Sequence, residues 1–264
     1  MTLSAYVAGI GVLGPGLSDW QQAKEILAGR QPFVRTPTQL PAPVLLPPAE
    51  RRRTGRVVKL ALAVALEASR HARIDPAALA SVFSASGGDG YILHELCEVL
   101  TTSREVSPTR FSNSVHNAPS GYWSIATGAM TESNVVCAFD ASFSAGLLEA
   151  ITQVQADNKD VLLVAYDTEY PEPLYSKRPI PDAFGIALVL TPAARERCDA
   201  KLTLELSPQE PQVLADAQLE AMRTAIPAAR GLPLLQSLAR GVPASVVLEY
   251  LRPRHLLLRV EPCP

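Results

Sequence analysis

The chain has 264 residues, of which 47% are hydrophobic and 19% charged, a composition typical of a folded globular protein and not of a disordered one. Its formal net charge of −2 gives no electrostatic basis for binding nucleic acid or a membrane surface. It has no run of about 18 apolar residues and no charged N-terminal region followed by a long apolar run, so we expect a cytoplasmic protein without membrane contact.

The cysteines are informative through their spacing. Cys97, Cys137, Cys198 and Cys263 lie far apart and form no C-x-x-C pair. We therefore expect neither a metal site nor a disulfide framework, and the pattern fits a reducing compartment.

The first 28 residues predict a strand over 4–13, a turn and a helix that begins at residue 18 or 19. Gly9, Gly11 and Gly14 have the G-x-G-x-x-G spacing of a dinucleotide-binding turn. Pro15 and the lack of a suitably placed acidic residue after a second strand argue against that site, so we expect no cofactor.

The next segments alternate between irregular and periodic sequence. Residues 31–50 are proline-rich and predict a surface excursion, whereas 57–72 predict a buried helix. Residues 81–86 predict a strand, and the glycine-rich turn 87–90 opens a helix over 91–100. This turn lacks the lysine and the length of a phosphate-binding loop.

A polar segment, residues 111–117, precedes another helix. We expect this segment to be extended, with Asn117 capping a helix that starts near Ala118 and holds Pro119 in its first turn.

Residues 134–169 form the central unit of the chain. They predict a strand over 135–139, a small-residue turn over 140–146, a helix and a second buried strand over 161–165. Such a strand-to-helix elbow exposes a side chain beside the positive end of a helix, which is where many α/β enzymes place a nucleophile.

The elbow itself offers Asp140, Ser142 and Ser144 and no cysteine, since Cys137 falls in the preceding strand. Beyond it, the pattern predicts strands over 183–190 and 202–206, helices over 211–228 and 233–240, and two edge strands over 246–251 and 255–260.

Three of these stretches resemble one family. The opening strand and turn resemble V-x-I-T-G-x-G-x-x-S/G-P-x-G, and Asn117, Gly121, Ser124 and Ile125 fit F-x-x-x-x-x-N-x-x-x-G-x-x-S-I. Together with the elbow, they resemble β-ketoacyl synthases over most of residues 1–190. The chain looks most like the short, β-ketoacyl-synthase-like chain length factors that accompany ketosynthases in bacterial aryl polyene pathways.

The resemblance implies an α/β fold in which a thiolase-like half has a five-stranded mixed sheet between helices and is followed by a shortened second part. Residues 1–195 would form the ketosynthase-like N-terminal half. Residues 196–264 would be a shortened C-terminal part that completes the same domain.

The resemblance also implies that the condensation chemistry is missing. Ketosynthases use an elbow cysteine and two histidines, in motifs of the type H-G-T-G-T and G-H-x-x-G-A-x-G, and the cysteine position falls here at or next to Asp140. His71, His94, His116 and His255 lie in no such motif. Without a thiolate and paired imidazoles, the chain is expected to be no enzyme by itself.

The implied function is a non-catalytic chain length factor that forms a heterodimer with a full-length ketosynthase, meets acyl carrier protein only indirectly, and shapes the acyl tunnel. The expected tunnel residues are Tyr91, Leu93, His94 and Leu96. The expected dimer-interface residues are Phe111, Asn113, His116, Asn117 and Trp123.

Two other function classes stay open at this point. Ser142 is an alternative nucleophile for an acyltransferase or hydrolase, although it lacks the G-x-S-x-G frame. A homodimeric module that binds acyl carrier protein is the other. Arg51, Arg52 and Arg53 are a solvated helix start, an ion-pair cluster or a docking site for acidic acyl carrier protein.

Overall fold

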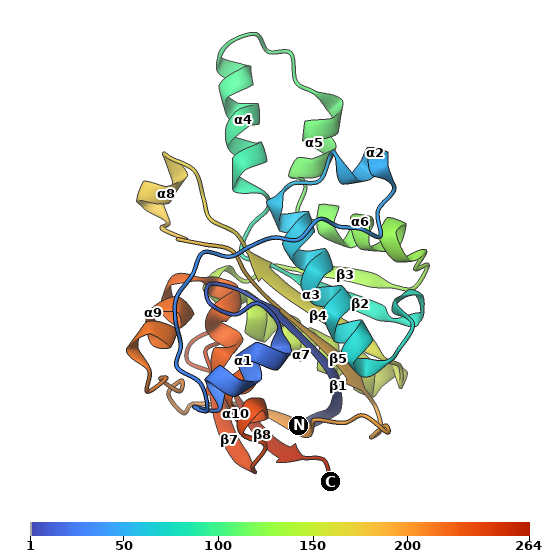
Figure 1. Cartoon of the computed structure of the whole chain (residues 1–264), viewed down its shortest axis with the longest axis vertical. Coiled ribbons are helices and arrows are strands. Elements are labelled where there is room, and N and C mark those ends of the chain that lie inside the picture. The colour runs from blue at the N-terminus through green and yellow to red at the C-terminus, as the bar shows by residue number, and fades with distance from the viewer. Residues whose placement is uncertain (1) are drawn as a thin grey trace.

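One mixed sheet organises the computed structural model, which describes residues 2–264 (Figure 1). Its eight strands have the order β3-β2-β4-β5-β1-β6-β8-β7. They are β1 (Leu3–Leu13), β2 (Ala80–Ser84), β3 (Ser133–Val136), β4 (Val161–Asp167), β5 (Phe184–Thr191), β6 (Ala200–Ser207), β7 (Ala244–Leu248) and β8 (His255–Pro262). The helices are α1 (Trp20–Leu27), α2 (Pro48–Arg51), α3 (Arg56–Ala72), α4 (Gly90–Thr101), α5 (Pro108–Ser114), α6 (Ala118–Thr127), α7 (Ser142–Asp157), α8 (Leu174–Lys177), α9 (Ala217–Ala225) and α10 (Leu232–Arg240), with short 3-10 turns η1 (Pro76–Ala78), η2 (Phe139–Ala141) and η3 (Pro227–Gly231).

The sheet confirms the predicted α/β class. β2 pairs in parallel with β3 and with β4, whereas the pairs from β4 through β5, β1, β6 and β8 to β7 are antiparallel. Residues 1–195 contribute the five strands β1 to β5, as expected for the N-terminal half, and β6, β8 and β7 from the C-terminal part extend the same sheet beyond β1. The prediction that β8 is an edge strand is wrong, since it lies between β6 and β7.

Each face of the sheet carries its own hydrophobic core. In β4, Val161, Leu163 and Ala165 join the core that includes α7, whereas Leu162 and Val164 join the core that includes α3. All seven residues of β4 are buried, as expected for a strand covered on both faces. The elbow at the start of α7 and the outer surface of α3 therefore lie on opposite faces of the sheet.

The glycines of β1 allow α3 to approach the sheet closely. A Cβ atom built on Gly9 would lie 2.2 Å from the carbonyl oxygen of Ala68, and one on Gly11 would lie 2.2 Å from that of Val64. Both glycines lie within the strand and not in the turn after it. Their role is thus helix–sheet packing, which gives the G-x-G-x-x-G spacing a structural explanation.

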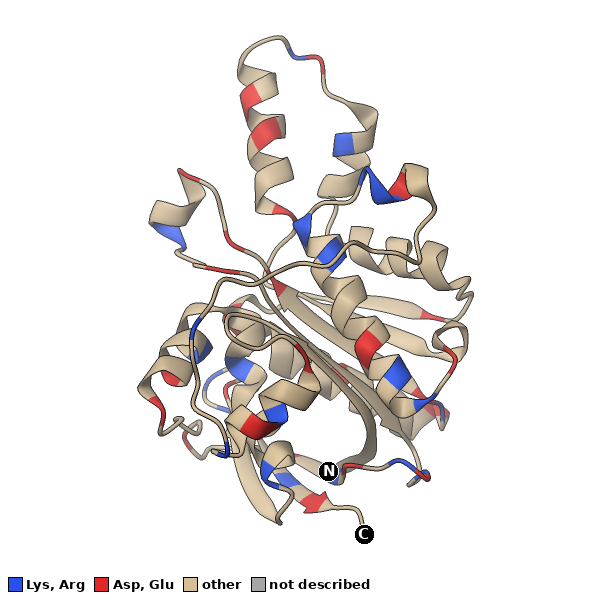
Figure 2. Cartoon of the chain, in the orientation of Figure 1, with Lys and Arg blue, Asp and Glu red and all other residues tan. Residues whose placement is uncertain are grey.

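Helices α4 and α5 project beyond the end of the sheet (Figure 1). The prediction that residues 111–117 are extended is wrong, because α5 covers Pro108–Ser114. The hydroxyl of Ser107 accepts a hydrogen bond from the backbone N–H of Arg110, and Pro108 occupies the first turn, which together start the helix. Figure 2 shows acidic residues on α4 and a basic residue on α5, and Arg110 forms an ion pair with Glu95.

Asn117 occupies the N-cap position of α6, and Pro119 lies in its first turn as predicted. The expected capping bond is absent, since the Asn117 side chain makes no hydrogen bond to the helix. The predicted helix over 211–228 is shorter than expected. α9 begins after Asp216, whose carboxylate accepts the N–H groups of Gln218 and Leu219, and it ends before Ile226, which is extended.

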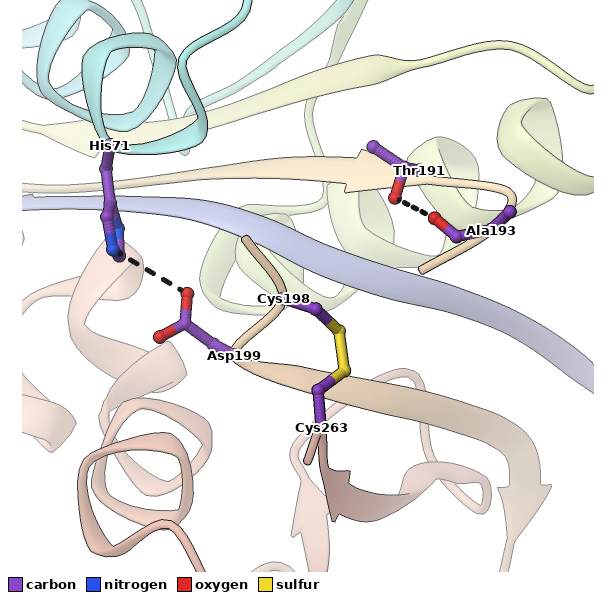
Figure 3. The surroundings of a disulfide bond; sticks show 6 residues. All are labelled: His71, Thr191, Ala193, Cys198, Asp199 and Cys263. Atoms are coloured by element: carbon purple, nitrogen blue, oxygen red, sulfur yellow. Dashed lines mark hydrogen bonds and ion pairs between the residues drawn. A yellow bond between two sulfur atoms is a disulfide. The ribbon is translucent and has the colours of Figure 1, made fainter. Parts of the chain in front are cut away.

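A disulfide joins Cys198 to Cys263 (Figure 3). The expectation of no disulfide is therefore wrong. The two cysteines are 65 positions apart, but the register that pairs Ala200 with Pro262 brings their Cα atoms to 5.7 Å. Cys97 and Cys137 are free and exposed. Within residues 2–264, no helix is both long and apolar enough to span a bilayer.

Candidate functional site at the strand-to-helix elbow

The elbow between β3 and α7 is built on a strained aromatic residue. β3 ends at Val136, the turn η2 follows, and α7 begins at Ser142. Phe139 in this turn has φ 53°, a left-handed conformation that is costly for a bulky side chain, and 61% of it is exposed. The turn therefore exposes a phenyl ring, next to Asp140, in a strained backbone conformation.

Two arginines hold the carboxylate of Asp140 beside this ring. Arg178 donates to it at 2.8 Å, and Arg230 lies 3.5 Å away. The guanidinium of Arg178 also stacks 3.7 Å from the centre of the Phe139 ring, a cation–π contact. Arg230 forms a second ion pair with Glu249, and burial lowers its pKa. The elbow is thus fixed by ion pairs to the segment before β5 and to η3.

The elbow serines brace the turn. Ser142 is 1% exposed; its hydroxyl donates to the carbonyl of Phe139 at 2.7 Å and accepts the N–H of Ala138 at 3.0 Å. Ser144 is fully buried and donates to the carbonyl of Glu249 at 2.6 Å. Both hydroxyls are therefore committed to backbone groups, which leaves neither in contact with a general base.

The histidines make their contacts elsewhere. His71 Nδ1 accepts the N–H of Ile10, and His255 Nδ1 accepts that of Tyr250. His94 lies 3.4 Å from Glu98, and His116 Nε2 lies 3.2 Å from the carbonyl oxygen of Ala85. In the described part of the chain, no histidine hydrogen-bonds to Asp140, Ser142 or Ser144.

Asp167 links two segments, one of which contacts the elbow. One oxygen of this buried carboxylate accepts the N–H and hydroxyl of Ser86, at 3.0 and 2.5 Å, and the other accepts the N–H of Ala228 at 2.8 Å. Burial raises the pKa of Asp167 to about 6. The carboxylate ties the segment after β2 to η3, which carries Arg230. In the sequence, the signal for this role of Asp167 was its position as an acidic residue at the end of a buried strand.

The four expected tunnel residues lie on the projecting helix α4. Tyr91 and Leu93 are 41% and 50% exposed, His94 is half-buried, and Leu96 is buried. Asp89 caps the helix by accepting the N–H groups of Tyr91 and Ile92. Two of the four therefore present apolar surface to the outside of the chain.

The expected interface residues divide in the same way. Phe111 is 62% exposed, Asn117 is exposed and His116 is half-buried. Asn113 and Trp123 are buried within the chain. Asn113 donates to the carbonyl of Arg53 and accepts the hydroxyl of Tyr122, so it joins α5 to its neighbours.

Other apolar side chains on or next to α5 and α6 are also exposed, which the sequence did not indicate. Val115, Ile125 and Met130 lie on or after α5 and α6 and are 43%, 54% and 96% exposed. β3 is the last strand of the sheet on this side, so one of its edges is unpaired. We refer to Phe111, Val115, Ile125, Met130 and the edge of β3 as the β3 face.

The three arginines before α3 behave differently from one another. Arg51 donates to the carbonyls of Val44 and Leu46, Arg53 pairs with Glu50 at 3.2 Å, and Arg52 is exposed. Two of the three thus have structural contacts. Among residues 2–264, no group of three or more His, Cys, Asp and Glu side chains is arranged to hold a metal ion.

Comparison with known proteins identifies the family. A family model described as "Beta-ketoacyl synthase, N-terminal domain" matches residues 18–245. No curated protein sequence matches the chain.

Solved structures show the same fold. A chain from the complex of a ketosynthase with its chain length factor from Xenorhabdus doucetiae has a TM-score of 0.73 and 22% identity, with 98% of this chain and 99% of that chain covered. The ishigamide ketosynthase/chain length factor gives a TM-score of 0.73 at 13% identity, covering 99% and 100%. A β-ketoacyl synthase from Burkholderia phymatum gives a TM-score of 0.58 at 13% identity, covering 86% of this chain but 71% of that one.

The family model covers most of the chain, and the fold, a mixed sheet with helices on both faces and an elbow at the start of α7, agrees with this match. The chain therefore belongs to the β-ketoacyl synthase family.

Proposed function

We propose that this chain is a chain length factor: a partner of a full-length ketosynthase that carries out no condensation itself and limits the length of the product. The observation that carries the proposal is the elbow. Its exposed, strained position holds Phe139, and the neighbouring carboxylate of Asp140 is engaged by Arg178 and Arg230. Neither group can form the thioester that condensation requires.

Chain length supports the same reading. The chain spans essentially the whole of the matched chains in the two complexes whose descriptions name a chain length factor. It spans only 71% of the Burkholderia phymatum synthase and 47% of a ketosynthase from the bacillaene pathway. Aryl polyene synthesis is a separate part of the proposal, and the sequence resemblance alone supports it as the pathway class.

The β3 face is the surface we assign to the ketosynthase. An unpaired strand edge offers backbone N–H and C=O groups to a second chain, and exposed apolar residues beside it gain free energy when a partner covers them. Phe111, His116 and Asn117 contribute to this contact directly, whereas Asn113 and Trp123 hold α5 and α6 in place from within.

The interface is tested by coexpression with a ketosynthase that carries the cysteine and both histidines. Ile125→Glu together with Phe111→Glu should abolish copurification, because buried, unpaired carboxylates cannot be accommodated in an apolar contact. Leu251→Glu, an exposed apolar position near the other end of the sheet, is the matched control and should leave copurification intact. Copurification of the double variant at the wild-type level would contradict the assignment.

The length-setting role is tested at α4. Tyr91→Ala and Leu93→Ala should lengthen the products of the pair, since forcing a further carbon unit against a packed wall costs about 1–3 kcal/mol and the smaller side chain removes that wall. Leu100→Ala, exposed on the same helix, is the control. Product masses are measured by mass spectrometry. If the distribution stays fixed in both variants while Asp140→Ala stops turnover, the elbow has a catalytic role and the proposal fails.

A further inference from the structure

The turn that leads from β2 into α4 contains glycines that its backbone conformation does not require. Gly87, Gly88 and Gly90 lie in this turn or at its end, and none of the three has a φ in the left-handed region. Two of them are limited by space instead. A Cβ atom on Gly87 would lie 2.6 Å from the hydroxyl oxygen of Tyr170, and one on Gly90 would lie 2.7 Å from the ring of the same residue. These glycines therefore make room for one aromatic side chain, which lies against the turn from Gly87 to Gly90.

Tyr170 follows β4 and is anchored by its surroundings. It is half-buried and packs against the hydrophobic core on the α7 face of the sheet. Its neighbour Glu169 forms an ion pair with Arg56 at the start of α3, at 2.6 Å. Asp167, three positions earlier, accepts the N–H and the hydroxyl of Ser86, the first residue of the turn. The tyrosine and the glycine turn are thus tied to each other through the end of β4, and moving the ring away from the turn would disrupt these contacts.

The position of α4 depends largely on its first turn. Only Gly90 and Leu96 are buried among the twelve residues of this helix, which projects beyond the sheet (Figure 1). Tyr91 and Leu93 follow Gly90 within one helical turn. A methyl group on Gly90 would have to move by about 1 Å to reach the ordinary contact distance of roughly 3.5–4.0 Å from the ring. This displacement would carry Tyr91 and Leu93 with it.

We propose that Tyr170 is a positioning residue for α4 and, through α4, sets the point at which product growth stops. The proposal rests on the chain-length role assigned above. Tyr170 acts through the backbone of Gly90 and not by contact with the product. A residue that determines product length therefore lies on the segment after β4, outside the helix to which the tunnel residues are assigned.

The first test measures the placement of α4. Tyr170→Ala removes the ring, so amide hydrogen exchange over residues 94–101, followed by mass spectrometry on the chain alone, should become faster by at least about tenfold. Tyr170→Phe keeps the ring and should change these rates by less than about threefold. Tyr175→Ala is the matched control, since this exposed tyrosine lies on α8 in the segment that follows, and it should exchange as the wild type does.

The same variants are then coexpressed with a ketosynthase, and product masses are measured. Tyr170→Ala should spread the products over more lengths and reduce the fraction at the wild-type length by at least about threefold, because α4 is no longer held in one position. Tyr170→Phe and Tyr175→Ala should keep the wild-type distribution. Wild-type products or wild-type exchange rates in Tyr170→Ala would overturn the proposal.

A double-mutant cycle separates positioning from a general loss of structure. Gly90→Ala places a methyl group against the ring of Tyr170 and should shift the product distribution. In the Tyr170→Ala background, the same substitution should have no further effect, because the ring that it would meet is gone. An equal effect of Gly90→Ala in the two backgrounds would show that the glycine does not act through Tyr170, which would also overturn the proposal.

The proposed function and this inference fail in different ways. If Tyr91→Ala and Leu93→Ala change product length but Tyr170→Ala does not, α4 sets the length without Tyr170, and the inference alone is overturned. If none of the three variants changes product length, while Tyr170→Ala still accelerates exchange in α4, the length-setting role of α4 is refuted together with the inference that rests on it.

Discussion

Two buried carboxyl groups determine the pH dependence that we expect of this fold. Burial raises the pKa of Glu67 to about 7 and that of Asp167 to about 6, whereas both groups have values near 4 in an unfolded chain. The folded protein therefore holds more protons than the unfolded chain between these values. The stabilising contribution is complete at low pH and is lost as the pH rises through about 6 for Asp167 and about 7 for Glu67.

The free energy of unfolding should consequently fall between pH 5 and pH 7, by up to about 1.4 kcal/mol per pH unit for each group. Urea denaturation at pH 5, 6, 7 and 8 measures this slope. Glu67→Gln removes one titrating group and should flatten the curve most between pH 6 and 7. A variant whose slope matches that of the wild type would show that Glu67 does not titrate in this range.

At the elbow, sequence reasoning located the turn but not the groups that fix it. Small residues after a short apolar run predict a strand-to-helix turn, and the structure has one at Phe139. Arg178 and Arg230 reach Asp140 from 38 and 90 positions further along the chain. No local pattern encodes such a pairing, because it depends on where η3 and the segment before β5 are placed by the sheet.

At the scale of single elements, the contact of α3 with β1 depends on the absence of two side chains. Gly11→Ala should lower the free energy of unfolding by about 3 kcal/mol or more, because the new methyl group would meet the backbone of Val64 and push the helix from the sheet. Gly121→Ala is the matched control. It lies in α6 with no atom within 4 Å of its Cβ position, so we expect it to stabilise the isolated chain by up to about 1 kcal/mol.

Chemical denaturation of the two variants measures both effects. Equal stabilities would mean that α3 adjusts to the extra methyl group at no cost. The periodic apolar residues of α3 were enough to predict that helix. The helix α5 was missed because Ser107 and Pro108, which start it, were not weighed against the polar residues that follow.

At the scale of the whole molecule, the disulfide closes a long loop. Cys198 and Cys263 are 65 positions apart, and a loop of this length is expected to contribute about 4 kcal/mol through the lost entropy of the unfolded chain. The double variant Cys198→Ser/Cys263→Ser should therefore unfold at a lower temperature than the oxidised wild type. Reductant should lower the unfolding temperature of the wild type and leave that of the double variant unchanged. Cys97→Ser, an exposed free cysteine, should respond to reductant as the wild type does.

The spacing of the cysteines in the sequence was not enough to predict this disulfide. Antiparallel pairing of β6 with β8 sets the distance between the two cysteines, and that register follows from the order of strands in the complete sheet. The order itself could not be deduced, because β6, β8 and β7 have similar apolar patterns and the sequence does not state which of them lies next to β1.

The central position of β1 affects how the protein is made in the cell. Tyr6 in this strand pairs with Thr191 and with Lys201, so it meets the first of these partners only after 185 further positions have been translated. At roughly 5–20 residues per second, the delay is on the order of 10–40 s. During it, an apolar N-terminal segment is exposed to other chains and to chaperones. Moving β1 to the end of the chain, after β8, by circular permutation would remove this interval.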